Sequence, residues 1–303
     1  MRKDISFNVD GLTCRGWCYR PDGVDEDKKL PLVVLLTGFG GVKEFAISTF
    51  AELFVERGFS ALVYDNRHTG DSDGEPRGRI VPSLQHDDLR AAIGWALEHE
   101  NIDPEKIILW GTSFGGAHAL FVGALDPRVS AIITVVAGLP PTGPGDRPDR
   151  AVREAMWTSL TADLMKYNVT GDDLAVPIVA PPGQPSLLRD EALSAWLRNM
   201  APAAPNWPNR VTIESRVRLA EYTPAAFIDL ISPRPLLMFA MSDDRMVPLR
   251  RHQAVFAQAG EPRRLEVMQG GHLDPYDDPL RGRVMNISVE WLARHGLGPS
   301  GLA

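Results

Sequence analysis

The chain has 303 residues, of which 44% are hydrophobic and 23% are charged. This length fits two domains or one large α/β domain, and the balance of residues excludes a disordered, collagen-like or coiled-coil protein. The 32 Lys and Arg residues against 39 Asp and Glu residues give a net charge of −7, which argues against binding to nucleic acid or to an anionic membrane surface. We therefore expect a small-molecule partner.

Neither a membrane span nor a signal peptide is predicted. No apolar run approaches the ~18 residues that would cross a bilayer, and the basic start MRKDISFNVD is not followed by the apolar segment of a signal peptide. Cys14 and Cys18 share one face of a predicted strand, which separates them by roughly 13 Å, too far for a disulfide. One pair of cysteines also supplies too few ligands for a structural zinc site. We expect a cytoplasmic protein with two reduced thiols.

The first half of the chain alternates extended and helical patterns. A hairpin is expected near the start, because Asp10-Gly11 joins two extended runs. The apolar run 31–36 has the continuous hydrophobicity of a strand buried on both faces. Alternation of strands and helices predicts βαβ units and a parallel sheet. Further strands are expected at 60–65, 106–110 and 131–136, and helices at 48–57, at 83–99 with Ser83 as the cap, and at 116–125.

The alternation stops between residues 139 and 225. This segment is rich in Pro and Gly and has helical patterns only near 151–167 and 187–200. Because proline interrupts sheets and long structureless loops are uncommon in compact domains, we predict an inserted cap at 139–225 over an α/β core formed by 1–138 and 226–303. Trp157, Trp196 and Trp207 favour a packed cap over a disordered linker. Beyond the cap, strands are expected at 233–241 and 263–269, and helices at 251–260 and 280–295.

A candidate nucleophile follows the strand at 106–110. The sequence Gly111-Thr112-Ser113-Phe114-Gly115 has the form G-x-S-x-G and lies between a strand and a helix. Such a turn strains the backbone of the serine, and glycines on both sides remove the collisions that side chains would cause there. We predict that Ser113 is a nucleophile exposed at the carboxyl end of the sheet. The alternative is a glycine-rich turn without a catalytic role.

A serine hydroxyl is a weak nucleophile unless a base removes its proton, and His272 has the best context for that base. It stands in MQGGHLDPYD, directly after a strand and two glycines, in a loop at the carboxyl edge of the sheet. His118 lies five residues after Ser113 on the same helix and is badly placed to act as the base. We name His118 and Trp157 as candidates for the substrate pocket, with a histidine packed inside the protein as the alternative for His118.

The remaining parts of a catalytic site also have candidates. A base needs a carboxylate to orient it, and Asp244 follows the strand at 233–241 directly and begins the pattern D-x-x-V-P, with Asp243 as the alternative. Attack on a carbonyl creates an oxyanion that backbone N–H groups stabilise. We expect these donors to be Phe114, at the start of the helix after Ser113, and Phe39, in the glycine-rich loop after the strand at 31–36.

Two acidic motifs are interpreted as structural. The segment 65–72 lacks the ligand spacing of a calcium loop, so Asp65 and Arg67 are expected to fix the long loop after a strand. Asp87 and Asp88 begin a helix, where carboxylates interact favourably with the helix dipole. No metal site is predicted from either motif.

The assembled residues resemble the α/β-hydrolase superfamily over nearly the whole chain. Within it, TGFGGVKE, YDNRHTGDSDGEPR, LWGTSFGGAH, YTPAAFIDLISPRPLL and GGHLDPY are similar to dienelactone-hydrolase-like esterases and to fungal polyketide transferases or thioesterases. The resemblance implies an α/β-hydrolase fold, with a mostly parallel central sheet flanked by helices and an inserted, mainly helical cap. It also implies acyl chemistry without a metal or cofactor, in which Ser113 takes the acyl group from an ester or thioester.

Three functions remain open at this point. The first is a serine hydrolase that cleaves carboxylic esters or thioesters of hydrophobic, medium-sized acyl groups. The second is an acyltransferase or thioesterase that releases a polyketide or similar acyl chain to an alcohol acceptor. The third is a ligand receptor on the same fold with an idle triad. The sequence leaves the oligomeric state open, a homodimer being one option.

Overall fold

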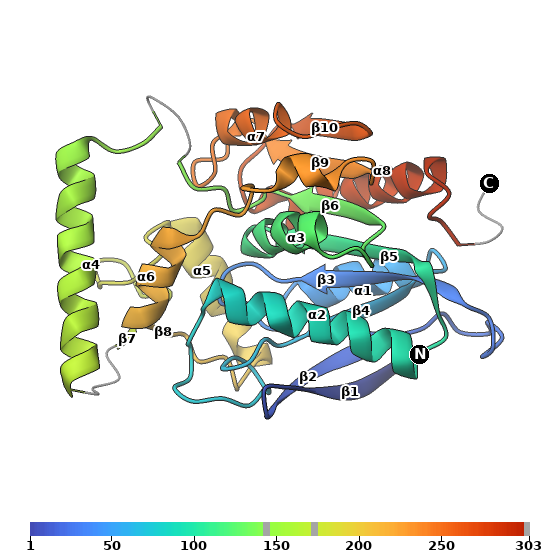
Figure 1. Cartoon of the computed structure of the whole chain (residues 1–303), viewed down its shortest axis with the longest axis horizontal. Coiled ribbons are helices and arrows are strands. Elements are labelled where there is room, and N and C mark those ends of the chain that lie inside the picture. Colours follow the sequence, from blue (N-terminus) through green and yellow to red (C-terminus); the bar gives the residue numbers. More distant parts are fainter. Residues whose placement is uncertain (142–145, 171–174, 300–303) are drawn as a thin grey trace.

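The computed structural model describes residues 1–141, 146–170 and 175–299. Its centre is an eight-stranded sheet with the strand order β1-β2-β4-β3-β5-β6-β9-β10 (Figure 1). The first two strands pair antiparallel with each other, and β2 pairs antiparallel with β4, whereas all later neighbours are parallel. The strands of this sheet are β1 (Arg2–Val9), β2 (Leu12–Tyr19), β3 (Leu30–Leu36), β4 (Ser60–Tyr64), β5 (Ile102–Thr112), β6 (Ala131–Val135), β9 (Leu236–Met241) and β10 (Arg263–Met268).

The predicted hairpin at the start of the chain is confirmed. Asp10 and Gly11 join β1 to β2 with positive φ angles of 50° and 81°, the backbone that a tight two-residue hairpin turn requires. Cys14 and Cys18 are both buried in β2 as free thiols, as the spacing predicted.

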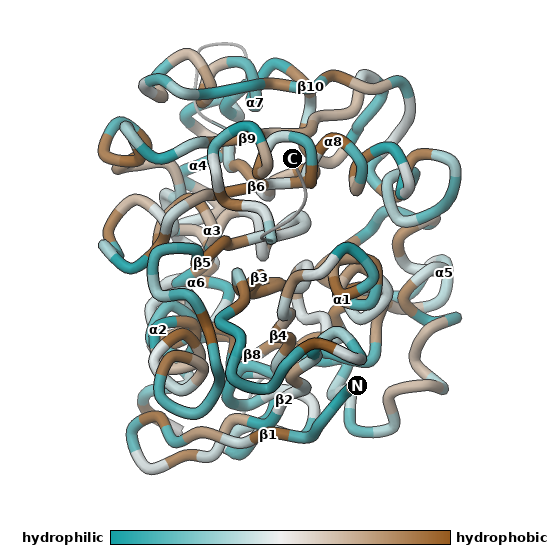
Figure 2. The backbone as a smooth tube through the Cα atoms, turned by 90° about the vertical axis from the view of Figure 1, so that its right-hand side faces the viewer, coloured by the Kyte–Doolittle hydropathy of each residue, from teal (hydrophilic) through white to brown (hydrophobic). Residues whose placement is uncertain are grey.

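Helices cover both faces of the sheet. Hydrophobic side chains of α1 and α8 pack on one face, and those of α2, α3 and α7 pack on the other. Strand β3 separates the two layers: Leu32 and Val34 belong to one cluster and Val33 and Leu35 to the other. This strand and β4 run through the middle of the molecule as hydrophobic segments (Figure 2). The helices are α1 (Ile47–Val55), α2 (Pro82–His99), α3 (Phe114–Leu125), α7 (Leu249–Phe256) and α8 (Leu280–Arg294).

The predicted N-cap of helix α2, Ser83, is wrong by two residues. Helix α2 begins at Pro82, and Val81 is its N-cap residue without a side-chain hydrogen bond. Proline suits the first helical position because its fixed φ angle is helical and its missing N–H is not needed there. Ser83 therefore lies inside the first turn.

The chain between β6 and β9 forms a separate group of short elements. The helical patterns at 151–167 and 187–200 correspond to α4 and α5, and residues 142–145 and 171–174 of the predicted cap lie outside the described residues. Side chains of α5 and of the segment 176–211 build a third hydrophobic cluster with Val42 and Phe45 of the core. The limits of the cap at 139 and 225 stay a prediction. The elements here are α4 (Arg150–Thr170), β7 (Ala175–Val176), α5 (Glu191–Met200), β8 (Val211–Thr212), α6 (Ile213–Glu221) and 3-10 turns at Ala201–Ala203 and Ile228–Ile231, with a further one at Asp274–Tyr276 after β10.

Helix α4 lies at the edge of the molecule and packs against α6 (Figure 1). Several of its large hydrophobic side chains are exposed, Trp157 among them at 37%. Nothing in the described part of the chain forms a helix long and apolar enough to cross a membrane.

The loop after β4 is fixed by a buried ion-pair cluster, as its structural interpretation predicted. The carboxylates of Glu44, Asp65 and Asp71 have oxygens within 4.8 Å of one another. The Lys43 ammonium lies among them, 2.6 Å from Glu44 Oε1, 2.8 Å from Asp65 Oδ2 and 2.5 Å from Asp71 Oδ2. Burial by itself would lower the pKa of Lys43, but the three carboxylates raise it above its usual value. The Lys43 ammonium thus occupies the place between the three carboxylates where a metal ion would bind.

Arg67 and Asp88 complete the support of this loop. Arg67 Nε donates to Asp88 Oδ1 at 2.6 Å, and the Arg67 backbone N–H donates to Asp88 Oδ2 at 3.0 Å. Both side chains are buried. Asp88 therefore stabilises the loop. The prediction that Asp87 and Asp88 begin the helix is wrong, because α2 starts at Pro82 and has no acidic residue in its first turn.

Replacing Lys43 by Met should destabilise the protein, because it leaves three carboxylates around a site that is only 3% exposed. Loss of one partner from a buried ion pair costs about 3–5 kcal/mol. Urea unfolding followed by circular dichroism measures this change. Arg150→Met is the matched control, since Arg150 and its partner Glu154 are exposed; an equal loss of stability in both variants would contradict this role of Lys43.

Candidate active site

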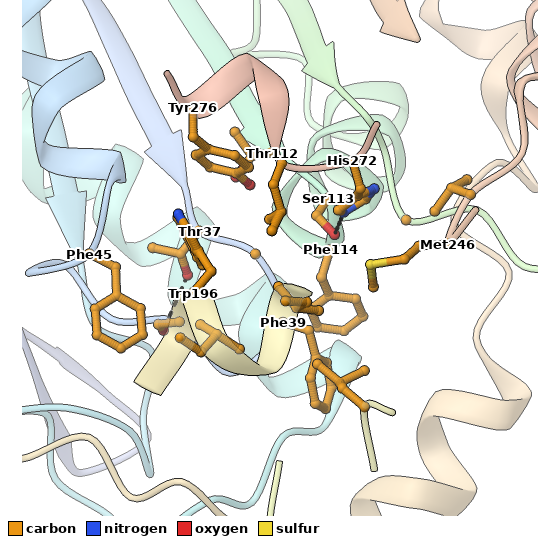
Figure 3. Close-up of a pocket in the computed structure, with 18 of the residues that line it drawn as sticks. Thr37, Phe39, Phe45, Thr112, Ser113, Phe114, Trp196, Met246, His272 and Tyr276 are labelled. Atoms are coloured by element: carbon orange, nitrogen blue, oxygen red, sulfur yellow. Dashed lines mark hydrogen bonds between the residues drawn. The ribbon is translucent and has the colours of Figure 1, made fainter. Parts of the chain in front are cut away.

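The three residues of the predicted triad come from the carboxyl ends of different strands. Ser113 follows β5, Asp244 follows β9 and His272 follows β10. The ends of parallel strands meet at one edge of a sheet, so residues separated by long stretches of sequence lie together there. Figure 3 shows the side chains of Ser113 and His272 pointing toward each other.

The turn around Ser113 has the geometry predicted for a nucleophile elbow. Ser113 has φ 49° and ψ −117°, outside the favoured regions for a residue with a side chain. A Cβ atom on Gly111 would lie 2.3 Å from the carbonyl oxygen of Gly115, and one on Gly115 would lie 2.2 Å from that of Leu36. Only glycine fits at these two positions, and the turn leaves the hydroxyl of Ser113 at the tip.

Hydrogen bonds connect the three side chains. His272 Nε2 lies 3.0 Å from Ser113 Oγ, and His272 Nδ1 lies 2.7 Å from Asp244 Oδ2. A proton on Nδ1 that is donated to the carboxylate leaves Nε2 free to accept the proton of the serine hydroxyl. Both His272 and Asp244 are buried. The arrangement is suited to activating a serine for nucleophilic attack.

Asp244, and not Asp243, faces the histidine. The other oxygen of Asp244, Oδ1, accepts hydrogen bonds from the backbone N–H groups of Met246 at 2.8 Å and Val247 at 2.9 Å. Burial alone would raise the pKa of Asp244, but the hydrogen bonds from His272 and from these N–H groups hold it below its ordinary value. Asp243 is exposed, and its carboxylate accepts from the Ser242 hydroxyl.

The two predicted oxyanion donors lie beside Ser113. Phe114 is the first residue of α3, and neither its backbone N–H nor that of Phe39 donates a hydrogen bond to another group in the described part of the chain. The rings of Phe39 and Phe114 pack edge to face with centroids 5.4 Å apart. Two side-chain hydrogen bonds fix the loop that carries Phe39: Thr37 Oγ1 donates to the Gly41 carbonyl, and Trp207 Nε1 donates to the Gly40 carbonyl.

A cavity of about 300 Å³ opens in front of Ser113. Its walls are mostly hydrophobic and come from the core and from the segment between β6 and β9. They include Phe45, Ile47, Leu139, Leu193, Trp196, Leu197, Leu219, Tyr222, Met246 and Tyr276. A cavity of this size and character suits a small organic molecule with an apolar part.

His118, a candidate for the pocket, does not line this cavity. Its ring lies behind that of Phe114, with centroids 4.3 Å apart. His118 Nε2 lies 2.9 Å from Gln85 Oε1, and His118 Nδ1 lies 3.1 Å from both His86 Nε2 and the Tyr222 hydroxyl. Burial lowers the pKa of His118 well below its usual value. The alternative of a packed histidine is therefore the one the structure supports.

Trp157, the second candidate for the pocket, is also corrected. It lies on the exposed helix α4 and does not contribute to the wall of the cavity. Trp196 of α5 takes that place. Sequence reasoning also missed Tyr222 and Tyr276 as lining residues; the segment GGHLDPY contains Tyr276 four residues after His272, and this closeness was the available signal.

A family comparison agrees with this geometry. The model of the alpha/beta hydrolase fold family matches residues 31–279. The chain belongs to the α/β-hydrolase family. This confirms the fold predicted from the motifs, and it makes the protein an enzyme of a family that acts on esters or thioesters.

Relatives that match nearly the whole chain place it more narrowly within the family. The chain is 32% identical over 299 residues to polyketide transferase ATR5 of Stachybotrys chlorohalonatus, covering 97% of each chain. It is 30% identical over 309 residues to a thiohydrolase of Eupenicillium brefeldianum, covering 99% of this chain and 95% of the relative. It is 29% identical over 299 residues to quorum-quenching protein AidA of Acinetobacter baumannii, with 96% and 94% covered. The resemblance to the polyketide transferase and thioesterase branch is thereby confirmed.

Solved structures show the same likeness. The α/β hydrolase GrgF from Penicillium sp. sh18 superposes with a TM-score of 0.82 at 28% identity, covering 97% of this chain and 99% of GrgF. The structure of DcsB in complex with its substrate analogue superposes with a TM-score of 0.81 at 25% identity, covering 97% and 99%. The similarity thus extends over the segment between β6 and β9 as well as the core.

Replacing Asp244 by Asn should lower kcat/KM for an ester substrate by about 10³-fold or more, because the histidine loses the partner that fixes its tautomer. Asp243→Asn is the matched control and should change kcat/KM less than about twofold, since Asp243 is exposed and does not contact His272. Steady-state kinetics on both variants measures the difference. A larger effect of Asp243→Asn would transfer the role to that residue.

Proposed function

We propose that the protein is a serine hydrolase that cleaves carboxylic esters or thioesters through an acyl-enzyme on Ser113. The observation that carries this proposal is the pair of hydrogen bonds that join His272 to Ser113 Oγ and to Asp244 Oδ2, at 3.0 Å and 2.7 Å. The family assignment supports it, as do relatives named for thioester hydrolysis and polyketide transfer.

In the first step, His272 Nε2 takes the proton of Ser113 while Oγ attacks the carbonyl carbon of the substrate. The negative charge that develops on the carbonyl oxygen is stabilised by the N–H groups of Phe39 and Phe114. Asp244, ionised because its pKa is lowered, stabilises the imidazolium that forms. His272 then donates the proton to the leaving alcohol or thiol, and the acyl group stays on Ser113.

In the second step, an acceptor attacks the acyl-enzyme and His272 removes its proton. When the acceptor is water, the product is a carboxylic acid; when it is an alcohol, the acyl group is transferred. The polyketide transferases among the relatives favour transfer as the second candidate function. The chemistry at Ser113 is the same in both, so the acceptor alone decides between them.

Labelling by a fluorophosphonate probe distinguishes this enzyme from a ligand receptor with an idle triad. The wild type should be labelled stoichiometrically, Ser113→Ala should not be labelled, and His272→Ala should react more slowly by about 10³-fold, because the base is missing. Intact-protein mass spectrometry measures the adduct. An unlabelled wild type that still binds hydrophobic esters would favour the receptor.

Product analysis with and without an alcohol separates hydrolysis from transfer. A thioester is incubated with the wild type in buffer and in the presence of a primary alcohol, and acid and ester products are quantified. A hydrolase should give mostly acid in both cases, and a transferase should give the ester whenever the alcohol is present. Ser113→Ala should give neither product above the uncatalysed rate, and product formation by that variant would contradict both functions.

A further inference from the structure

The predicted oxyanion donor Phe39 stands in a short turn whose other residues are all glycine. The turn covers Gly38, Phe39, Gly40 and Gly41, and the N–H of Gly41 donates to the Gly38 carbonyl at 3.0 Å. Gly40, in the third position, has φ 64°, a backbone conformation that favours glycine. Such a turn uses the N–H of its fourth residue and leaves the N–H of its second residue, Phe39, outside its own hydrogen bond. Three glycines give this stretch of chain little stiffness of its own.

This turn contacts both the nucleophile and the segment between β6 and β9. At Gly38 it lies next to the nucleophile, because a Cβ atom on Gly38 would be 3.6 Å from Ser113 Cβ. At Gly40 it lies against the segment, because a Cβ atom on Gly40 would be 2.5 Å from Ile178 Cδ1. The two contacts are only two positions apart in the chain, with Phe39 between them. The position of the Phe39 N–H therefore depends on how the segment packs on the turn.

Trp207 binds the turn from that segment by a hydrogen bond. Its Nε1 donates to the Gly40 carbonyl at 2.7 Å, across 167 positions of the sequence. Two further hydrogen bonds, from the Gly41 N–H and from Thr37 Oγ1, stay within the turn and the residue before it, so they do not connect it to a distant part of the chain. The ring of Trp207 packs edge to face on Phe45, with centroids 5.4 Å apart, which fixes the direction of its N–H.

We infer that Trp207 is a positioning residue for the reaction: its hydrogen bond to Gly40 holds the Phe39 N–H at the place where the oxyanion forms. The inference rests on the proposed function, since it concerns the transition state of the attack by Ser113. Donors stabilise an oxyanion most when they are aligned before the charge develops, and a displacement of about 1 Å costs on the order of 10²-fold in rate. The segment between β6 and β9 thereby determines the rate of the reaction as well as the shape of the pocket.

Asn206, the neighbour of Trp207, offers a matched control. Asn206 Nδ2 donates to Asp71 Oδ1, so this residue also connects the segment to the core, but at the loop after β4 and not at the turn. Asn206→Ala therefore removes a hydrogen bond of the same kind one position away. Trp207→Phe removes the indole N–H and keeps an aromatic ring next to Phe45.

The first experiment measures steady-state hydrolysis of p-nitrophenyl butyrate. Trp207→Phe should lower kcat by about 10- to 100-fold and change KM less than about twofold, because the hydrogen bond acts on the transition state and not on substrate binding. Asn206→Ala should change both constants less than about twofold. Thermal unfolding checks that each variant is folded. If Trp207→Phe does not fold, the amino acid 3-benzothienylalanine placed at position 207 keeps the shape of the indole and removes the N–H alone.

Two inhibitors of similar shape separate the oxyanion from the rest of the binding. A trifluoromethyl ketone with a hexyl chain accepts Ser113 Oγ at its carbonyl carbon, its carbonyl π electrons become the oxyanion, and the serine proton passes to His272. The alcohol obtained by reducing this ketone has no carbonyl and binds without that step. In Trp207→Phe the inhibition constant of the ketone should rise by the factor by which kcat falls, whereas that of the alcohol should change less than about twofold.

An unchanged kcat in Trp207→Phe, with an active wild type, would overturn the inference. An equal loss of affinity for the ketone and for the alcohol would overturn it as well, because the variant would then disturb the pocket in general. So would an Asn206→Ala variant as slow as Trp207→Phe. Absence of turnover by the wild type, together with absence of phosphonate labelling, would instead reject the proposed function. The two failures are therefore distinguishable.

Discussion

The sharp turn from β5 into α3 is the constraint on which the site depends. It holds Ser113 in a left-handed backbone conformation, with φ 49°, that a residue with a side chain seldom adopts. The turn is possible because Gly111 and Gly115 have no Cβ atoms to collide with the neighbouring backbone. Conformations of this kind persist only when the surrounding structure enforces them. Here the Ser113 N–H donates to the Val135 carbonyl of β6, and the Gly138 N–H donates to the Ser113 carbonyl, so the sheet itself holds the turn.

Hydrogen bonds also fix the groups around the Ser113 hydroxyl, namely the pair of His272 and Asp244 and the loop that carries Phe39. Asp244 is held by two backbone N–H groups as well as by His272, so the histidine ring has one favoured orientation. The loop that carries Phe39 is fixed by a hydrogen bond from Trp207 Nε1 to the Gly40 carbonyl. Trp207 belongs to the segment between β6 and β9. That segment therefore helps to fix the loop of Phe39, a predicted oxyanion donor, and also contributes to the wall of the cavity. Groups held in place before the substrate arrives need little reorganisation during the reaction.

The sequence predicted the triad because each member directly follows a strand that is recognisable by its own pattern. Ser113 and Asp244 stand after apolar runs, and His272 stands after the mixed strand Arg263–Met268. The carboxyl ends of parallel strands meet whatever the distance along the chain. The choice of Asp244 over its neighbour depended on the short pattern D-x-x-V-P, and the structure gives it a physical basis: the N–H groups of Met246 and Val247 bind one oxygen and direct the other toward His272.

The pocket was harder to predict, since its walls depend on which face of a helix turns inward. His118 lies one helical turn beyond Phe114, and residues four apart share a helix face, so its ring is placed behind Phe114 rather than in front of the nucleophile. Trp157 and Trp196 both stand in helical patterns within 139–225, but α4 remains largely exposed whereas α5 packs against the core. Local periodicity indicates a helix and does not indicate how that helix docks.

The most direct test of this account is the mass of the peptide that contains Ser113, isolated by acid quench while a thioester is being turned over. If Ser113 forms the acyl-enzyme, this peptide gains the mass of the acyl group, and the acyl group is bound to Ser113. An acyl group bound to a different residue would contradict it, as would an unmodified peptide combined with undiminished turnover by Ser113→Ala.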